Sequence, residues 1–131
     1  MRLLLDTHIW LWSLLEPARL SKRVAATLED PHTELWLSPI SVWEVLMLAE
    51  RKRVILTPDA EAWVRESLEQ VPVHEAAVNH EIAIESRLID LEHDDPADRF
   101  LAATARVYDL TLVTADRRLF KAKRFSVLRN P

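Results

Sequence analysis

The chain has 131 residues, of which 49% are hydrophobic and 29% charged, and its formal net charge at pH 7 is -4. This length suits one layered core and this composition is typical of a globular protein, so we expect a single domain over residues 1–131. Cysteine and glycine are both absent, which excludes disulfides, zinc–thiolate sites, thiol catalysis and glycine-rich phosphate-binding loops.

Short apolar runs alternate with helix signals in the first 70 residues. The predicted strands are Leu3–Leu5 and Thr33–Leu37. Ser38 and Pro39 mark a helix start, because serine caps helix N-termini and proline favours the first helical position. The predicted helices run from the residue after Asp6 to Leu15, from Ser21 to Glu29, from Ser38 to about Arg51 and from Thr57 to about Gln70.

The same alternation continues to the C-terminus. The predicted strands are Val71–Val73, Leu110–Thr114 and Phe125–Leu128, and the predicted helices are about Glu75–Leu91, Asp95–Tyr108 and Asp116–Lys121. Strands that alternate with helices favour a parallel sheet with helices on both faces. We therefore expect a three-layer α/β fold with a mostly parallel central sheet of about five strands.

Charge is distributed unevenly along the chain. Residues 1–97 contain 9 basic and 18 acidic side chains, whereas residues 98–131 contain 8 basic and 3 acidic ones, which gives -9 and +5. The basic C-terminal part suits contact with phosphates, although a solvated helix face with internal ion pairs explains the same charges.

No segment suggests a membrane span or a secretion signal. The longest apolar stretches, residues 1–15 and 35–48, are interrupted by charged side chains, including Asp6 and Glu44. Neither is long enough to cross a bilayer, and a signal peptide needs a basic start and an uninterrupted apolar segment. We expect a cytoplasmic protein without membrane association.

Acidic residues occupy the positions that approach one another in a parallel α/β sheet. Asp6 ends the first strand, Asp116 follows the strand that ends at Thr114, and Asp98 lies in the first turn of a helix. The carboxyl ends of parallel strands open into one crevice. Glu44, in the helix after the second strand, is expected to complete the group.

The surroundings of Glu44 indicate a need for a cation. Its neighbours at three and four positions are Ile40, Ser41, Met47 and Leu48, so its carboxylate emerges from a largely apolar helix face, where an unpaired charge is costly. Clustered carboxylates resist ionisation unless a divalent ion compensates them. Oxygen ligands without thiols favour Mg²⁺ or Mn²⁺, which support phosphodiester hydrolysis.

Each acid also has a structural explanation. Asp98 could belong to a capping arrangement with Asp95, and Asp116 could cap the helix that follows it. Asp6 and Glu44 could form buried salt bridges with arginines. The case for a metal site rests on all four acids together.

Four motifs resemble those of the PIN domains, and within them the VapC-like toxins of toxin–antitoxin pairs. They are LLLDTHIWLW at residues 3–12, SPISVWEV at 38–45, DPADRFLAATA at 95–105 and LTLVTADRRL at 110–119. Similar sequences often have glycine before the third motif and near the strand before the last aspartate. This chain has none, so we expect different loop shapes there.

The resemblance implies both chemistry and partners. It makes Asp6, Glu44, Asp98 and Asp116 the catalytic residues and the ligands of Mg²⁺ or Mn²⁺, with Thr7 and Thr114 supporting them, and we assign Asp95 to capping. It also implies cleavage of single-stranded RNA, inhibition by a cognate antitoxin and a homodimer. Arg99, Arg117 and Arg118 adjoin the acids and either contact RNA phosphates or pair with carboxylates.

Two other functions compete with a metal-dependent ribonuclease. In a catalytically silent binding module, the same acids would form salt bridges only. A phosphohydrolase with a strand-end aspartate as nucleophile usually has a second aspartate two residues later, where this chain has His8. We assign structural or surface roles to the five histidines. Most of the five tryptophans are expected in the core or an interface, with Trp10 and Trp12 as candidates for a partner surface.

Overall fold

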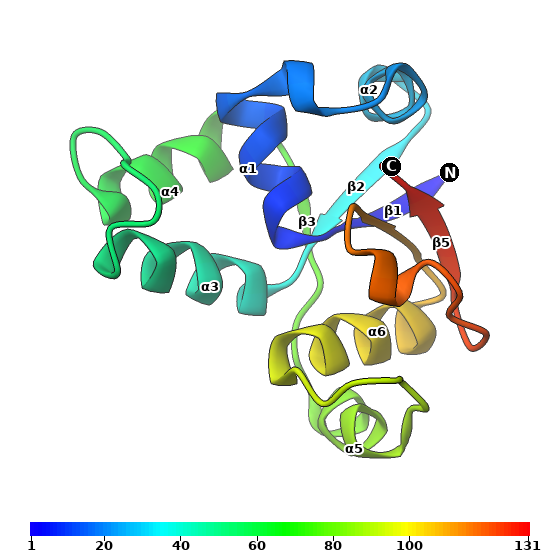
Figure 1. Ribbon diagram of the computed structural model, residues 1–131. Coiled ribbons are helices and arrows are strands. Elements are labelled where there is room, and N and C mark those ends of the chain that lie inside the picture. The colour runs from blue at the N-terminus through cyan, green and yellow to red at the C-terminus, as the bar shows by residue number, and fades with distance from the viewer.

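A five-stranded parallel sheet forms the centre of the computed structural model, which describes residues 1–131 (Figure 1). The strands are β1 (Arg2–Leu5), β2 (Glu34–Leu37), β3 (His74–Glu75), β4 (Thr111–Thr114) and β5 (Ser126–Arg129). Their order is β3-β2-β1-β4-β5, so β1 pairs with β2 on one side and β4 on the other. The boundary between β1 and β4 is therefore the switch point at which sheets of this kind bind ligands.

Helices cover both faces of the sheet, which confirms the predicted three-layer architecture. They are α1 (Thr7–Leu15), α2 (Lys22–Glu29), α3 (Pro39–Glu50), α4 (Ala60–Gln70), α5 (His80–Leu88) and α6 (Pro96–Tyr108). Helices α5 and α6 lie on the opposite side of the sheet from α1 and α2 (Figure 1). None of the helices combines the length and the hydrophobicity needed to span a bilayer.

Alternation along β1 divides the interior into two apolar clusters. Leu3 and Leu5 pack with residues of α1, α2, α3 and α4, whereas Leu4 packs with Leu101 and Ala105 of α6. All three leucines are at most 2% exposed. Successive side chains of a strand point to opposite faces, so a strand buried on both faces is continuously apolar. This double burial fixes the position of Asp6 at the end of β1.

Three predicted segments differ in the structure. β3 lies at His74–Glu75 rather than at residues 71–73, because Val71 caps α4 through its N–H and β3 pairs with Trp36 and Leu37 of β2. Helix α5 begins only after Asn79, whose side chain accepts a hydrogen bond from the Ile82 N–H. The helix predicted at residues 116–121 is a 3-10 turn, Arg117–Leu119.

Non-glycine residues occupy the two left-handed backbone positions. Asp109 caps the end of α6 with φ 54°, and Lys52 follows α3 with φ 57°. Glycine is the usual residue at such positions because it has no Cβ, and aspartate tolerates them better than most. Asp109 lies two residues before β4, so the glycine-free chain uses an aspartate for this left-handed turn.

Arg99 is a structural residue of the connection between α5 and α6. It is only 9% exposed. Its Nε donates to the Ser86 carbonyl at 2.7 Å and its Nη2 to the Ile89 carbonyl at 2.6 Å. The guanidinium is therefore engaged by backbone acceptors, and the RNA contact predicted for Arg99 does not fit its buried position.

Substitution of Arg99 should destabilise the fold strongly. In Arg99→Ala the buried carbonyls lose charged donors, so we expect the free energy of unfolding to fall by about 2–4 kcal/mol. Arg106, also in α6, is the control, because its ion pair with Glu85 involves a side chain that is 46% exposed. Arg106→Ala should cost less than about 1 kcal/mol. Equal losses in urea unfolding would contradict the role given to Arg99.

Candidate functional site

The ends of β1 and β4 bring Asp6 and Asp116 together through one hydroxyl group. Thr114 Oγ1 donates to Asp6 Oδ2 at 2.6 Å and accepts a hydrogen bond from the Asp116 N–H at 3.0 Å. Thr114 is completely buried and Asp6 is 9% exposed. The other oxygen of Asp6 caps α1 by accepting from the Thr7 N–H at 2.7 Å. These contacts fix the Asp6 carboxylate at the switch point of the sheet.

Thr7 joins α1 to Glu44 of α3. Its hydroxyl donates to Glu44 Oε1 at 2.5 Å and lies 3.1 Å from the hydroxyl of Ser41, one turn earlier in α3. Both Thr7 and Ser41 are buried, whereas Glu44 is partly exposed. The predicted apolar face of Glu44 therefore carries a small polar contact that orients the carboxylate.

Asp98 enters the site from the first turn of α6. Asp95 is the N-cap of that helix, and its side chain accepts from the Asp98 N–H at 3.2 Å, so its position agrees with a capping role. Asp98 itself is 8% exposed. Arg118 Nη2 lies 2.8 Å from Asp116 Oδ2 and 3.4 Å from Asp98 Oδ2. One exposed arginine thus bridges two of the four predicted acids.

The four predicted acids line one cavity of about 350 Å³. Its lining residues are Asp6, His8, Trp12, Glu44, Asp95, Asp98, Ala115, Asp116 and Arg118. Five carboxylates therefore face a single arginine. Trp12 belongs to this lining, whereas Trp10 is 2% exposed, so burial excludes Trp10 from the partner surface predicted for it.

The cavity perturbs the acids in two directions. Burial and the negative charges of nearby aspartates, Asp6 first among them, raise the pKa of Asp98 to about 8. Burial also raises the pKa of Asp6 and the pKa of Glu44. Hydrogen bonds from Arg118 lower the pKa of Asp116. Carboxyls that are hard to ionise are expected where like charges meet in a partly dry site.

The donor set of this cavity fits a divalent cation. Asp6 and Glu44 accept hydrogen bonds from hydroxyl groups and have no basic side chain paired with them, and Arg118 supplies one positive charge to the other acids. A cation with two charges would relieve the remaining repulsion, and carboxylate oxygens are its preferred ligands. All four predicted acids line this cavity, and ligand oxygens of Asp98 and Asp116 lie within 4.8 Å of each other.

His93 also reaches the site, although the sequence suggested a structural or surface role for it. Its Nε2 is buried without a hydrogen-bond partner and lies 3.4 Å from Asp98 Oδ2. Its Nδ1 accepts from the Asp95 N–H at 3.3 Å, so in the neutral ring the proton lies on Nε2, which faces Asp98. One ligand atom each of His93, Asp98 and Asp116 lie within 4.8 Å of one another. The only sequence signal was the position of His93 in the turn before the third motif.

The comparisons with known proteins agree on one family. The PIN domain model matches residues 3–125. The chain is 35% identical over 119 residues to Ribonuclease VapC22 of Mycobacterium tuberculosis, and the match covers 88% of each chain.

Solved structures share the fold at lower identity. DNA-bound VapBC from Salmonella typhimurium has a chain with a TM-score of 0.71 and 16% identity, and the match covers 100% of this chain and 99% of that one. A chain of VapBC2 from Rickettsia felis, bound to a promoter DNA fragment, has a TM-score of 0.70 and 14% identity, with 98% of both chains covered.

The raised pKa of Asp98 predicts that the metal-free protein becomes less stable as the pH rises. Between its ordinary pKa of 3.8 and about 8, Asp98 binds its proton more tightly in the folded chain than in the unfolded one. The unfolding free energy therefore falls across this range, until the folded carboxyl ionises near pH 8.

Urea unfolding in EDTA at pH 5 and pH 8 measures this effect. Asp98→Asn should show a smaller decrease than the wild type, whereas Asp94→Asn, which alters a side chain that is 77% exposed, should behave like the wild type. A decrease in Asp98→Asn as large as that of the wild type would contradict the assignment.

Proposed function

This chain belongs to the PIN domain family, and from that premise we propose that residues 1–131 form one PIN domain acting as an endoribonuclease on single-stranded RNA, the toxin of a toxin–antitoxin pair. The observation that carries the proposal is the convergence of four carboxylates from β1, α3, α6 and the end of β4 on one cavity. The relative named a ribonuclease shares 35% of its residues over 88% of the chain.

We propose Mg²⁺ or Mn²⁺ as the cofactor, with Asp6, Glu44, Asp98 and Asp116 as both ligands and catalytic residues. The hard oxygen donors and the absence of thiols support this choice. When bound, such an ion supplies Lewis acidity toward a phosphodiester and promotes ionisation of the attacking water.

The remaining residues of the site hold these carboxylates in place. Thr114 orients Asp6 and the backbone of Asp116, and Thr7 orients Glu44. His93 Nε2 lies 3.4 Å from Asp98 Oδ2, and a group that close to a metal-ligating carboxylate is placed to influence its orientation. Arg118 and the exposed Arg117 are proposed to contact RNA phosphates, a role that Arg99 cannot share.

The partners follow from the same family. Solved structures that share the fold include a member of the VapBC family of toxin–antitoxin systems, which supports a cognate antitoxin that blocks the site of this chain. We further propose a homodimer and a cytoplasmic location. Both extend the family resemblance to this chain.

A catalytically silent binding module fits the cavity less well. In such a module the acids would be neutralised by salt bridges. Asp6 and Glu44 instead accept hydrogen bonds from threonine hydroxyls, and only Arg118 among the arginines reaches the acidic group. The uncompensated charge favours the metal-dependent enzyme.

Purified protein without antitoxin should cleave single-stranded RNA with Mg²⁺ or Mn²⁺ and stop when EDTA is added. Asp6→Asn and Asp116→Asn should each reduce the rate about 100-fold or more, because several kcal/mol of transition-state stabilisation depend on the bound ion. A time course on a labelled oligonucleotide measures both effects. Asp94→Asn is the matched control and should cleave like the wild type.

Mn²⁺ titration gives an independent readout, since Trp12 lines the cavity and its fluorescence should respond to the ion. The response should disappear in Asp6→Asn. RNA cleavage that survives in both Asp6→Asn and Asp116→Asn would refute the proposal.

Substitutions of Asp95 distinguish a helix-capping role from a metal-ligand role. Asparagine caps helices about as well as aspartate, so Asp95→Asn should retain both stability and cleavage, whereas Asp95→Ala should lose about 1 kcal/mol of unfolding free energy. Thermal unfolding and the RNA time course measure the two properties. If Asp95→Asn folds normally but loses cleavage, Asp95 is a metal ligand and the capping assignment is wrong.

A further inference from the structure

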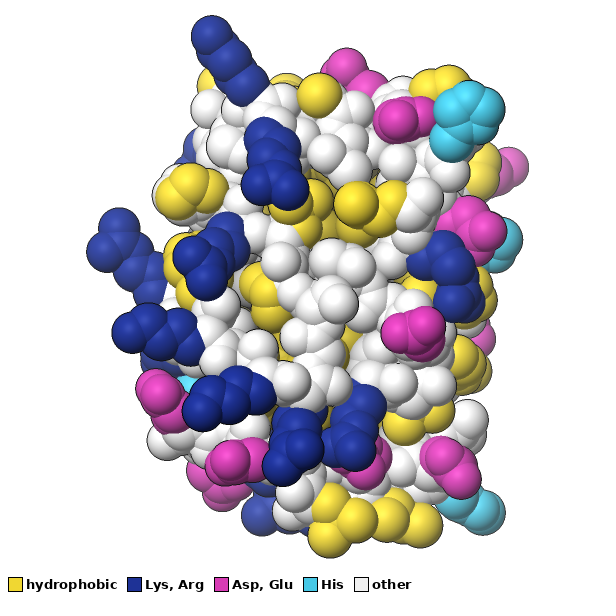
Figure 2. All heavy atoms as spheres, turned by 90° about the vertical axis from the view of Figure 1, so that its right-hand side faces the viewer, with side chains coloured by type: hydrophobic (Ala, Val, Ile, Leu, Met, Phe, Trp, Pro, Cys, Tyr) yellow, Lys and Arg dark blue, Asp and Glu magenta, His cyan; other side chains and the backbone are white.

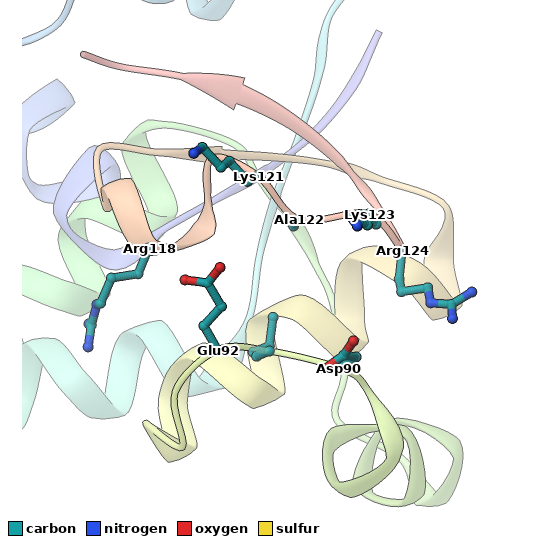
Figure 3. Close-up of a pocket in the computed structure, with 8 residues that line it drawn as sticks. Asp90, Glu92, Arg118, Lys121, Ala122, Lys123 and Arg124 are labelled. Atoms are coloured by element: carbon teal, nitrogen blue, oxygen red, sulfur yellow. The ribbon is translucent and has the colours of Figure 1, made fainter.

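A second cavity, of about 490 Å³ (Figure 3), shares Arg118 with the acidic one. We call it the basic pocket, and its lining residues are Asp90, Leu91, Glu92, Arg118, Lys121, Ala122, Lys123 and Arg124. The segment between the 3-10 turn and β5 forms one wall, and the connection between α5 and α6 forms the other (Figure 3). The lining thus includes four cationic and two carboxylate side chains.

The cations of this pocket are largely free to bind an anion. Only Arg118 is paired with acids, and these are Asp116 and Asp98 of the neighbouring cavity. Lys121, Lys123 and Arg124 are exposed and make no ion pair or side-chain hydrogen bond. Figure 2 views the molecule from the right-hand side of Figure 1. Many Lys and Arg side chains gather along the left side of this view.

Arg118 lines both the acidic cavity and the basic pocket, so the two sites adjoin each other. A polyanion with one phosphate at the acidic cavity would therefore meet Arg118 first and the other cations next. Only two lining residues, Leu91 and Ala122, are hydrophobic. Hot spots of protein interfaces are rich in Trp, Tyr and Arg at a desolvated centre. The basic pocket has no aromatic side chain in its lining, so it favours a phosphate backbone over a protein segment.

We propose that the basic pocket binds the sugar–phosphate backbone of single-stranded RNA next to the bond that is cleaved, with Lys121, Lys123 and Arg124 as the contacting cations. This proposal rests on the ribonuclease function proposed above and adds the path of its substrate. Contacts with phosphates position a nucleic acid without reading its sequence. The pocket is therefore expected to strengthen binding of all RNA sequences alike.

The test compares two double variants that each remove two exposed, unpaired cations. Lys121→Ala/Arg124→Ala alters the basic pocket, and Arg51→Ala/Arg53→Ala is the control at the far end of α3. Fluorescence anisotropy of a labelled single-stranded RNA, with Ca²⁺ and at several salt concentrations, gives the dissociation constant. Loss of two phosphate contacts should reduce the slope of log affinity against log salt by about 1.4.

We expect the pocket variant to bind RNA about 10-fold more weakly or worse, on the scale of lost phosphate contacts, and the control variant to bind like the wild type. In cleavage assays with Mn²⁺, the KM of the pocket variant should rise while its kcat stays unchanged. Equal RNA affinity and salt slope in the pocket variant and the wild type would overturn the proposal. So would a variant that retains RNA affinity but no longer binds the antitoxin, which would assign the pocket to that protein.

Binding and cleavage fail separately in this design. If the wild type binds RNA through the pocket but never cleaves it, the RNA-binding role of the pocket is supported and the ribonuclease function is refuted. Cleavage that is unaffected by the pocket variant would sustain the ribonuclease and refute the pocket.

Discussion

Mutual repulsion among buried carboxylates is the constraint on which the structure of the site depends. Five acids share one cavity with a single arginine, and burial together with the negative charges of neighbouring aspartates raises the pKa of Asp98 to about 8. The fold accepts this cost because Asp6 and Asp98 are fixed by elements that are buried elsewhere, β1 in the sheet and α6 against it. Repulsion that the packing cannot relax is the reason we propose a dication at this site.

The second layer of contacts explains how the chain holds the acids apart at fixed positions. Two threonine hydroxyls serve three acids on β1, α3 and the end of β4. On the other side, Arg99 gathers the carbonyls at the end of α5 and so fixes the connection that carries His93. The polar contacts of Arg99 therefore contribute both to the stability of the fold and to the position of His93 at the site.

The sequence predicts the features that depend on local pattern. Continuous apolar runs marked β1, β2, β4 and β5, and acids directly after two of these strands indicated their convergence. β3 was misplaced because its two residues are defined by pairing with β2 rather than by any alternation. The burial of Arg99 and the approach of His93 to Asp98 depend on how α5 returns to α6. Such contacts between elements leave no periodic signal in the chain.

Anomalous X-ray scattering from crystals grown with Mn²⁺ tests the central claim most directly, because it locates the ion without reference to activity. The account predicts a manganese peak inside the acidic cavity, coordinated by carboxylate oxygens of Asp6, Glu44, Asp98 and Asp116, with Arg118 withdrawn from at least one carboxylate. A cavity without a manganese peak, in which Arg118 still bridges Asp98 and Asp116, would contradict it.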